Sequence, residues 1–282
     1  MKVFLGLVLL SLSSVLWAEP LAHRMVDSST PRLVLLMDDL GYVKKLGDRA
    51  LALQGQITYA VLPFTPYANH FAAKVVASKR ELMAHVPMEN SNDKALGPGA
   101  LTASMTKSEI QAMVHKVLDS MPQVAGMNNH MGSVLTQNKQ SMQWVMEVLA
   151  ARDLYFVDSV TTVKTQGWRE AKALELPYLK RHVFIDHVAS EPAIERQLNR
   201  AIALAKRNGF AVAIAHPYKE TLTVLEKVLP TLAEQGVALA PASEISQPLV
   251  KARLANYAKQ KALDIAKHGQ TIPNKLHTHT DG

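Results

Sequence analysis

Cysteine is absent from this sequence of 282 residues. Its absence excludes disulfide bonds, cysteine nucleophiles and thiolate metal sites, so a bound metal must be held by His, Asp or Glu. A protein without disulfides depends on its core for stability. Because 48% of the residues are hydrophobic, the chain can build a substantial core.

The sequence also lacks a dense run of Lys or Arg, although its formal net charge is +7. The basic residues are scattered and are not interleaved with aromatic ones, so we expect no nucleic-acid partner. A basic surface suits anionic cell-wall polymers and lipid head groups equally well. Internal repeats and low-complexity linkers are missing between residues 32 and 245, which predicts one domain there.

The first twenty residues, MKVFLGLVLLSLSSVLWAEP, have the layout of a secretory signal peptide. Lys2 precedes an apolar run from Val3 to Leu10, and small residues lie near Ala18. We expect a signal peptide over residues 1–18, cleavage after Ala18, a linker over residues 19–31 and a periplasmic or otherwise exported protein. The alternative is an uncleaved membrane anchor, but the apolar run is short and broken by serines, so we expect no stable membrane span after cleavage.

Between these residues and Pro248, short apolar runs alternate with amphipathic segments. The expected strands are Leu33–Met37, Ile57–Leu62, Glu81–Val86, Val124–Met127, Tyr155–Val157, Val183–Ile185, Val212–Ala215 and Val237–Ala240. The expected helices span roughly residues 44–53, 68–79, 107–120, 138–151, 190–208 and 219–235. Alternating strands and helices indicate parallel βα units, and eight strands favour a distorted or incomplete (β/α) barrel with a mainly parallel sheet, a single α/β domain over residues 32–247. A doubly wound open sheet is the alternative.

The chain changes character after Pro248. The stretch KARLANYAKQKALDIAKHG is basic and amphipathic, and the residues after it have the composition of a tail. We therefore expect a basic C-terminal helix and a disordered tail over residues 248–282.

Six of the expected strands end on polar side chains. In chain order these are Asp38 and Asp39, His85, Asn128 to His130 with Ser133, Asp158, Asp186, and His216. In a parallel barrel these strand ends share one rim, where active sites are built. Three histidines and at least two aspartates there have the composition of a mononuclear metal site. Each residue alone also has a structural explanation: the adjacent aspartates of LVLLMDDLGY, for example, could simply form an acidic turn that ends a strand.

Several of these segments resemble known motifs. LVLLMDDLGY, ITYAVLPFTPYA, ELMAHVPMEN, GMNNHMGS, YFVDSVTT, VFID and AIAHPY occur in the order and spacing of the divergent polysaccharide deacetylase family. This YibQ-like group of exported bacterial proteins is distantly related to NodB-type carbohydrate esterases. The resemblance covers about residues 32–246 and implies a distorted (β/α) barrel.

The resemblance also implies roles for individual residues. In the NodB-type enzymes the first motif pairs a general-base aspartate with a metal-binding aspartate, and these positions fall on Asp38 and Asp39. The first histidine of the metal-binding motif falls on His85, and His130 resembles the remaining ligand. The final histidine motif, which supplies a general acid, resembles AIAHPY at His216.

Two positions depart from the family pattern. The NodB-type enzymes take both metal-binding histidines from one motif, four residues apart, but Glu89 stands four residues after His85 here. The second histidine, His130, must therefore come from a different strand end. The family block also has an arginine after "DS", where this chain has Val160.

These roles imply metal-dependent hydrolysis. A divalent metal, expected to be Zn, held by two His and one Asp keeps positions open and lowers the pKa of bound water to about 7. We expect Asn129, Ser133, Asp158 and Asp186 to bind substrate or the oxyanion.

The sequence thus predicts an exported hydrolase that removes acetyl groups from N-acetylated or O-acetylated envelope glycan by metal-activated water. The expected partner is a carbohydrate polymer or oligosaccharide. One alternative is a non-catalytic periplasmic protein that keeps the fold and binds glycan or protein. Another is an amidase or esterase that acts on a different acyl substrate, because the same site chemistry serves both.

Overall fold

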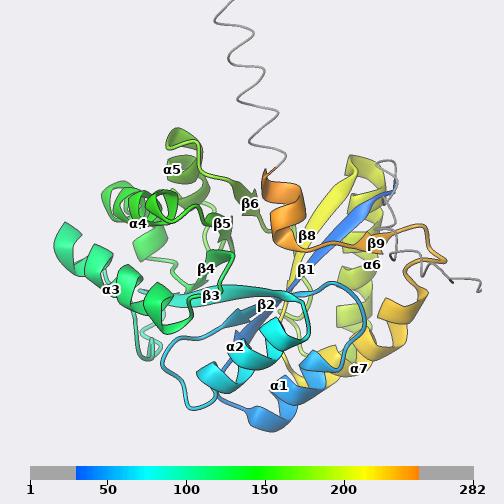
Figure 1. Ribbon diagram of the computed structural model, residues 1–282. Coiled ribbons are helices and arrows are strands. Elements are labelled where there is room, and N and C mark those ends of the chain that lie inside the picture. Colours follow the sequence, from blue (N-terminus) through cyan, green and yellow to red (C-terminus); the bar gives the residue numbers. More distant parts are fainter. Residues whose placement is uncertain (1–29, 248–282) are drawn as a thin grey trace, which may run out of the picture.

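The computed structural model describes residues 30–247 (Figure 1). The predicted signal peptide and the predicted C-terminal helix and tail lie outside the described residues, as does nearly all of the predicted linker. The strands are β1 (Arg32–Leu40), β2 (Thr58–Val61), β3 (Glu81–Met88), β4 (Gly126–Met131), β5 (Tyr155–Asp158), β6 (Tyr178–Lys180), β7 (Val183–Phe184), β8 (Phe210–Ala215) and β9 (Ala238–Leu239). The α-helices are α1 (Lys44–Leu51), α2 (Ala68–Ala77), α3 (Lys107–Ser120), α4 (Lys139–Ala151), α5 (Gly167–Ala173), α6 (Glu191–Asn208) and α7 (Lys219–Val228).

The nine strands form one parallel sheet that curls back on itself. Its order is β6-β5-β4-β3-β2-β1-β8-β7, with β9 paired to β1. The two ends of this path, β6 and β7, are consecutive in the chain and are separated only by Arg181 and His182. The segment that contains them therefore pairs first with β5, through β6, and then with β8, through β7. The predicted distorted (β/α) barrel is confirmed, and its seam is a bent stretch of chain without a β6–β7 ladder.

Two apolar layers hold this barrel together. The inner cluster, which includes Val34, Leu36, Met83 and Ile214, fills the space between the strands. The larger outer cluster lies between the sheet and the surrounding helices (Figure 1). Because both faces of the strands are buried, β1 is almost continuously apolar up to Asp38, as a strand in a covered parallel sheet should be.

The predicted elements agree with the observed ones at most positions. Helix α3 begins with a capping box of Thr106 and Glu109, in which each side chain binds the backbone N–H of the other residue. The helix expected over residues 219–235 ends at Val228, where a 3₁₀ turn containing Pro230 follows. Proline donates no N–H hydrogen bond, so it ends the regular helix.

Strand β6 and helix α5 are absent from the sequence prediction because both are short. β6 has three residues, too few for an alternating pattern to be recognised, and α5 has seven residues with Gly167 at its first position. Helix α5 is fixed by tertiary contacts instead, since the N–H of Trp168 donates to the buried Asp158 carboxylate at the end of β5.

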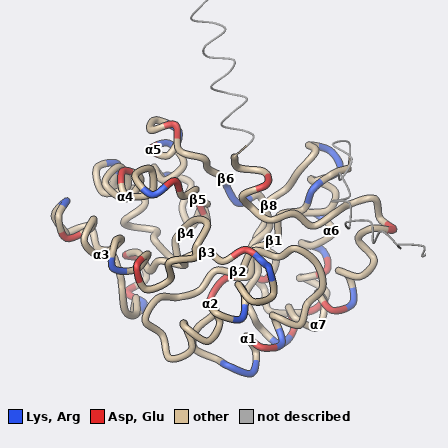
Figure 2. The backbone as a smooth tube through the Cα atoms, in the orientation of Figure 1, with Lys and Arg blue, Asp and Glu red and all other residues tan. Residues whose placement is uncertain are grey.

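Charge is spread over the outside of the fold. Figure 2 shows Lys and Arg interspersed with Asp and Glu along the helices and loops. Within residues 30–247, no helix combines the length and apolar character that a bilayer crossing requires.

Candidate metal centre

The centre begins with a backbone irregularity at the end of β1. Side chains alternate between faces along a regular strand, so adjacent aspartates should point apart. Here Met37 pairs with Tyr59 and Leu40 pairs with Val61, so β1 carries one more residue than β2 across this interval. Asp39 also has φ of 60°, in the left-handed region. This bulge lets both carboxylates approach His85 Nε2, Asp38 Oδ2 at 3.7 Å and Asp39 Oδ1 at 3.0 Å.

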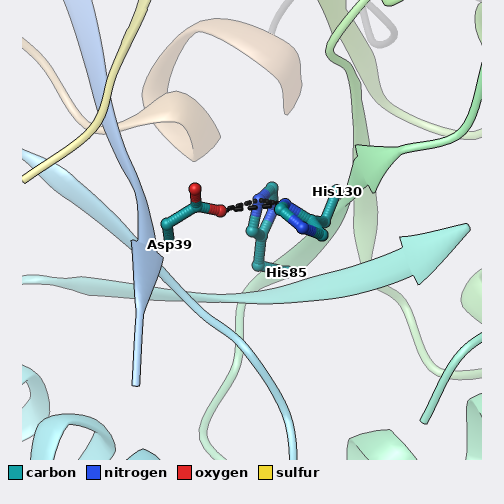
Figure 3. A group of neighbouring side chains, drawn as sticks. All are labelled: Asp39, His85 and His130. Carbon is teal, nitrogen blue, oxygen red and sulfur yellow. Dashed lines mark hydrogen bonds and ion pairs between the residues drawn. The ribbon is translucent and has the colours of Figure 1, made fainter. Parts of the chain in front are cut away.

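Three side chains from three strands meet at this point (Figure 3). Asp39 ends β1, His85 lies on β3 and His130 lies on β4. Asp39 Oδ1 lies 3.0 Å from His85 Nε2 and 2.9 Å from His130 Nδ1, and the two ring nitrogens are 3.1 Å apart. The three predicted ligands thus present one atom each to a common position.

The donor set and its spacing fit a small divalent cation. With ligands at about 2.1 Å, two donor atoms lie about 3.0 Å apart at a right angle and about 3.4 Å apart at a tetrahedral angle. The three separations of 2.9–3.1 Å are close to these edges. Two imidazoles and one carboxylate suit Zn²⁺ and other first-row divalent metals, and three protein ligands leave positions for water and substrate.

Asn128 connects Asp38 to His85, although the sequence predicts no role for it. It lies directly opposite His85 in the β3–β4 ladder and is fully buried. Its Nδ2 donates to both oxygens of Asp38 at 3.0 Å, and its Oδ1 lies 2.7 Å from His85 Nδ1. Because Oδ1 can only accept, His85 must carry a proton on Nδ1. The neutral form therefore has its lone pair on Nε2, the atom that faces Asp39 and His130.

The two adjacent carboxylates have opposite electrostatic environments. Burial raises the pKa of Asp38, and the nearby His85 and His216 only partly offset this effect. Burial also acts to raise the pKa of Asp39, but hydrogen bonds from His130 and His85 outweigh it and hold that pKa well below its usual range. Asp39 therefore keeps its negative charge at neutral pH, whereas Asp38 takes up a proton more readily than a free aspartate does.

His216 follows β8 and lies on the other side of Asp39, with Nε2 3.9 Å from Asp39 Oδ2. Its Nδ1 lies 2.9 Å from Asp186 Oδ1, and its backbone N–H donates to Asp186 Oδ2. Burial alone would lower the pKa of His216, but the pairing with Asp186 and the other site carboxylates raise it to about 9. The rings of Phe184 and Tyr218 stack on the imidazole at 5.8 and 5.5 Å and fix its plane. His216 is thus a protonated imidazole with Nε2 turned to the site.

The residues predicted to bind substrate or the oxyanion have other contacts. Asn129 is buried, donates to the backbone oxygen of Met131 and accepts from the N–H of Ser159. Asp158 is also buried and accepts hydrogen bonds from the start of α5, so both side chains join elements of the fold. Ser133 bonds to Ser91 in the loop after β3.

Two further side chains have contacts that define their roles. Asp186 orients His216 through the hydrogen bonds given above, and it also accepts from Thr221. Glu89, at the position of the family's second histidine, accepts a hydrogen bond from the N–H of Ala103. Because the Glu89 carboxylate is bonded to the segment that contains Ala103, His130 is the residue that completes the triad with Asp39 and His85.

A cavity of about 470 Å³ opens beside the triad. Asp39 and His130 form part of its wall, together with residues that follow β1, β2, β3, β4 and β8. Its other walls are mostly aliphatic side chains and prolines. The volume lies within the range of small-molecule binding sites, about 300–1,000 Å³.

Comparison with known proteins gives consistent matches. The model of the divergent polysaccharide deacetylase family matches residues 35–246. The chain is 36% identical over 219 residues to the uncharacterized protein YibQ of Escherichia coli (strain K12), covering 78% of this chain and 69% of that protein. It is 32% identical over 203 residues to an uncharacterized protein of Haemophilus influenzae (strain ATCC 51907 / DSM 11121 / KW20 / Rd), covering 72% of each. The crystal structure of an uncharacterized protein from Agrobacterium tumefaciens C58 has the same fold, with a TM-score of 0.74 and 20% identity over 77% of this chain and 89% of that one.

Proposed function

The chain belongs to the divergent polysaccharide deacetylase family, and from this premise we propose that it is a metal-dependent hydrolase of acylated envelope glycan, with acetyl the simplest acyl group. One observation carries the proposal. The triad of Asp39, His85 and His130 has a separate acid and a separate base on either side of it, His216 and Asp38. Metal-dependent hydrolysis of an amide uses these three functions together.

The triad residues would hold the cation, with Zn²⁺ the best match to the donor set. A cation there would polarise a water molecule and the acyl carbonyl and lower the pKa of the water to about 7. Asp39 contributes a full negative charge to the ligand set because its pKa is depressed. Asn128 fixes the tautomer and the ring plane of His85 from behind.

The chain's own groups account for the two proton transfers. Asp38 accepts the proton of the attacking water, and its position is held by the hydrogen bonds from Asn128. The new C–O bond forms at the acyl carbon, and the C–N bond to the sugar breaks as His216 Nε2 donates its proton to the leaving nitrogen. Asp186 stabilises the imidazolium before this transfer and holds Nε2 toward the site.

Release of acetate from N-acetylglucosamine oligomers and from peptidoglycan tests this proposal. Zinc-reconstituted protein should release acetate, and His216→Ala should lower kcat/KM by about 10²–10⁴-fold, the usual contribution of general acid–base catalysis. His70→Ala is the matched control, because His70 binds Asp48 on the surface rather than the triad. A zinc-loaded, folded protein that releases acetate from neither substrate would favour the alternative of a non-catalytic glycan- or protein-binding role.

We further propose export, on the strength of the signal-like residues 1–18. Expression of the full chain in a Gram-negative host should give a periplasmic product whose N-terminal residue is Glu19. A cytoplasmic product that begins at Met1 would contradict this.

A further inference from the structure

The cavity beside the triad is built mainly from apolar side chains, which do not form hydrogen bonds with sugar hydroxyls. Its aliphatic wall includes Leu40, Val43, Leu46, Leu62, Leu96 and Met131. Four prolines also line the cavity, and a proline residue has no N–H group that could donate a hydrogen bond. A pocket that recognises a sugar ring needs several polar groups aimed at its hydroxyls.

The few polar groups of the cavity are already in use or lie at its ends. Asp39 and His130 belong to the triad. The hydroxyl of Thr65 donates to the backbone oxygen of Leu62. Two phenols, of Tyr42 and Tyr218, complete the polar side chains of the lining. Among the described residues that line the cavity there is no Lys, Arg, Asn or Gln, and the only carboxylate is the ligand Asp39.

The position of the cavity relative to the acid is informative. Asp39 and His130 line it, and so do Pro217 and Tyr218, which directly follow His216, the residue that donates a proton to the leaving nitrogen in the proposed reaction. The cavity therefore begins where the reacting groups lie, and its aliphatic walls suit the acyl group of the substrate better than the polar sugar. An acetyl group would place only one methyl there and leave most of the 470 Å³ unfilled.

Two of the wall segments approach each other closely at one point. A Cβ atom added at Gly97 would lie 3.0 Å from the hydroxyl of Tyr42, so the loop after β3 approaches the β1–α1 loop directly. Gly97 has φ of +84°, a conformation that favours glycine. The loop that carries Leu96 and the loop that carries Tyr42 and Val43 therefore lie side by side at the cavity.

We infer that this cavity binds an aliphatic acyl chain of several carbons, so that the preferred substrate is an N- or O-acyl sugar with a chain longer than acetyl. This inference rests on the proposed function for the reaction, and it specifies the acyl group. Each methylene that becomes fully buried should improve binding up to about fourfold.

Binding of the free carboxylate products tests the cavity without requiring turnover. Calorimetry with zinc-loaded protein should give octanoate at least tenfold tighter binding than acetate. Leu96→Trp and Val43→Trp, which fill the cavity from a loop and from an exposed position, should reduce this preference to less than threefold. Leu174→Trp is the matched control, since Leu174 is an exposed leucine directly after α5 and outside this cavity, and it should keep the full preference.

The inference is overturned if octanoate binds no more tightly than acetate, or if both cavity variants keep the preference. Turnover of N-acetyl and N-octanoyl glucosamine oligomers separates the two proposals. Hydrolysis of the acetyl substrate with no gain for octanoyl would contradict the acyl-chain inference and leave the hydrolase proposal standing. Octanoate preference in a protein that hydrolyses neither amide would support the cavity assignment and contradict the hydrolase proposal.

Discussion

Asp38 and Asp39 differ in pKa direction although one peptide bond separates them. Burial acts to raise the pKa of both, but at Asp39 the hydrogen bonds from His130 and His85 together with the nearby imidazole charges outweigh it, whereas at Asp38 they do not. Pairs of titratable groups with diverging pKa values are typical of sites that divide acid, base and ligand roles. The two acidic residues at the end of β1 share His85 and His216 as neighbours, but only Asp39 accepts hydrogen bonds from imidazoles, and only Asp38 accepts from Asn128.

The pairing of His216 with Asp186 predicts a pH dependence. The pKa of His216 is raised from 6.5 to about 9, so the protonated acid is present below that pH and is lost as the pH rises through it. Asp186→Asn removes the charge that contributes most to this rise, so the alkaline limb of kcat/KM should move to lower pH, toward 6.5. A pH–rate profile on an N-acyl sugar measures this shift, and an unchanged alkaline limb in the variant would contradict the assignment of His216 as the acid.

The sequence predicted the roles of some residues at the site but not of others. The three candidate ligands Asp39, His85 and His130 could be predicted because they lie at strand ends and in segments that resemble family motifs. Asn128 could not, because its role depends on lying opposite His85 in the β3–β4 register, which a single sequence does not specify. Asn129 and Asp158 were predicted at the site because they too follow strands, but their side chains are buried in contacts between elements.

Among the elements, β1 matters most because its bulge aims both aspartates at one point. The left-handed φ of Asp39 is tolerated by Asn and Asp and is unfavourable for β-branched residues. Asp39→Asn and Asp39→Val both remove the ligand charge, but only the valine variant adds backbone strain. We expect Asp39→Val to be less stable than Asp39→Asn by about 1–2 kcal/mol in urea unfolding. Equal stability of the two variants would show that the conformation at Asp39 does not require a short polar side chain.

The junction between β5 and α5 gives a second test. Asp158 accepts from Val160 N at one oxygen and from Thr165 Oγ1 and Trp168 N at the other. In Asp158→Asn, one of these acceptor positions becomes an NH₂ group, and we expect a loss of about 2–3 kcal/mol in stability.

Metal content and KM should be unchanged in Asp158→Asn, because the carboxylate joins elements of the fold. Asp119→Asn, an exposed aspartate on α3, is the control and should change stability by less than about 0.5 kcal/mol. A raised KM with unchanged stability would instead support the substrate-binding role that the sequence suggested for Asp158.

At the scale of the whole molecule, the barrel brings together polar side chains from strand ends that are far apart in the chain. Asp39, His85, His130 and His216 span most of the described sequence and converge because parallel strands end at one rim. Alternation of strands and helices was enough to predict this convergence. The bent seam at β6 and β7 was not predictable, since both strands are short and take their positions from β5 and β8.

A ligand that binds only the folded barrel should stabilise it. At zinc concentrations 100-fold above Kd, the gain is about 2.7 kcal/mol, which corresponds to a rise in Tm of about 5–10 °C for a domain of this size. The gain should fall with falling pH, because His85 has a raised pKa and must lose a proton to act as a ligand. Scanning calorimetry at pH 8 and pH 5.5 measures both effects, and an equal gain at both pH values would contradict a histidine-based site.

Zinc content is the most direct test of the account. After dialysis against micromolar zinc and removal of excess, elemental analysis should find about one equivalent in the wild-type protein and in His70→Ala. It should find less than a tenth of an equivalent in Asp39→Ala, His85→Ala and His130→Ala. Wild-type protein without zinc, or full occupancy in the three triad variants, would contradict the claim that Asp39, His85 and His130 form a metal centre.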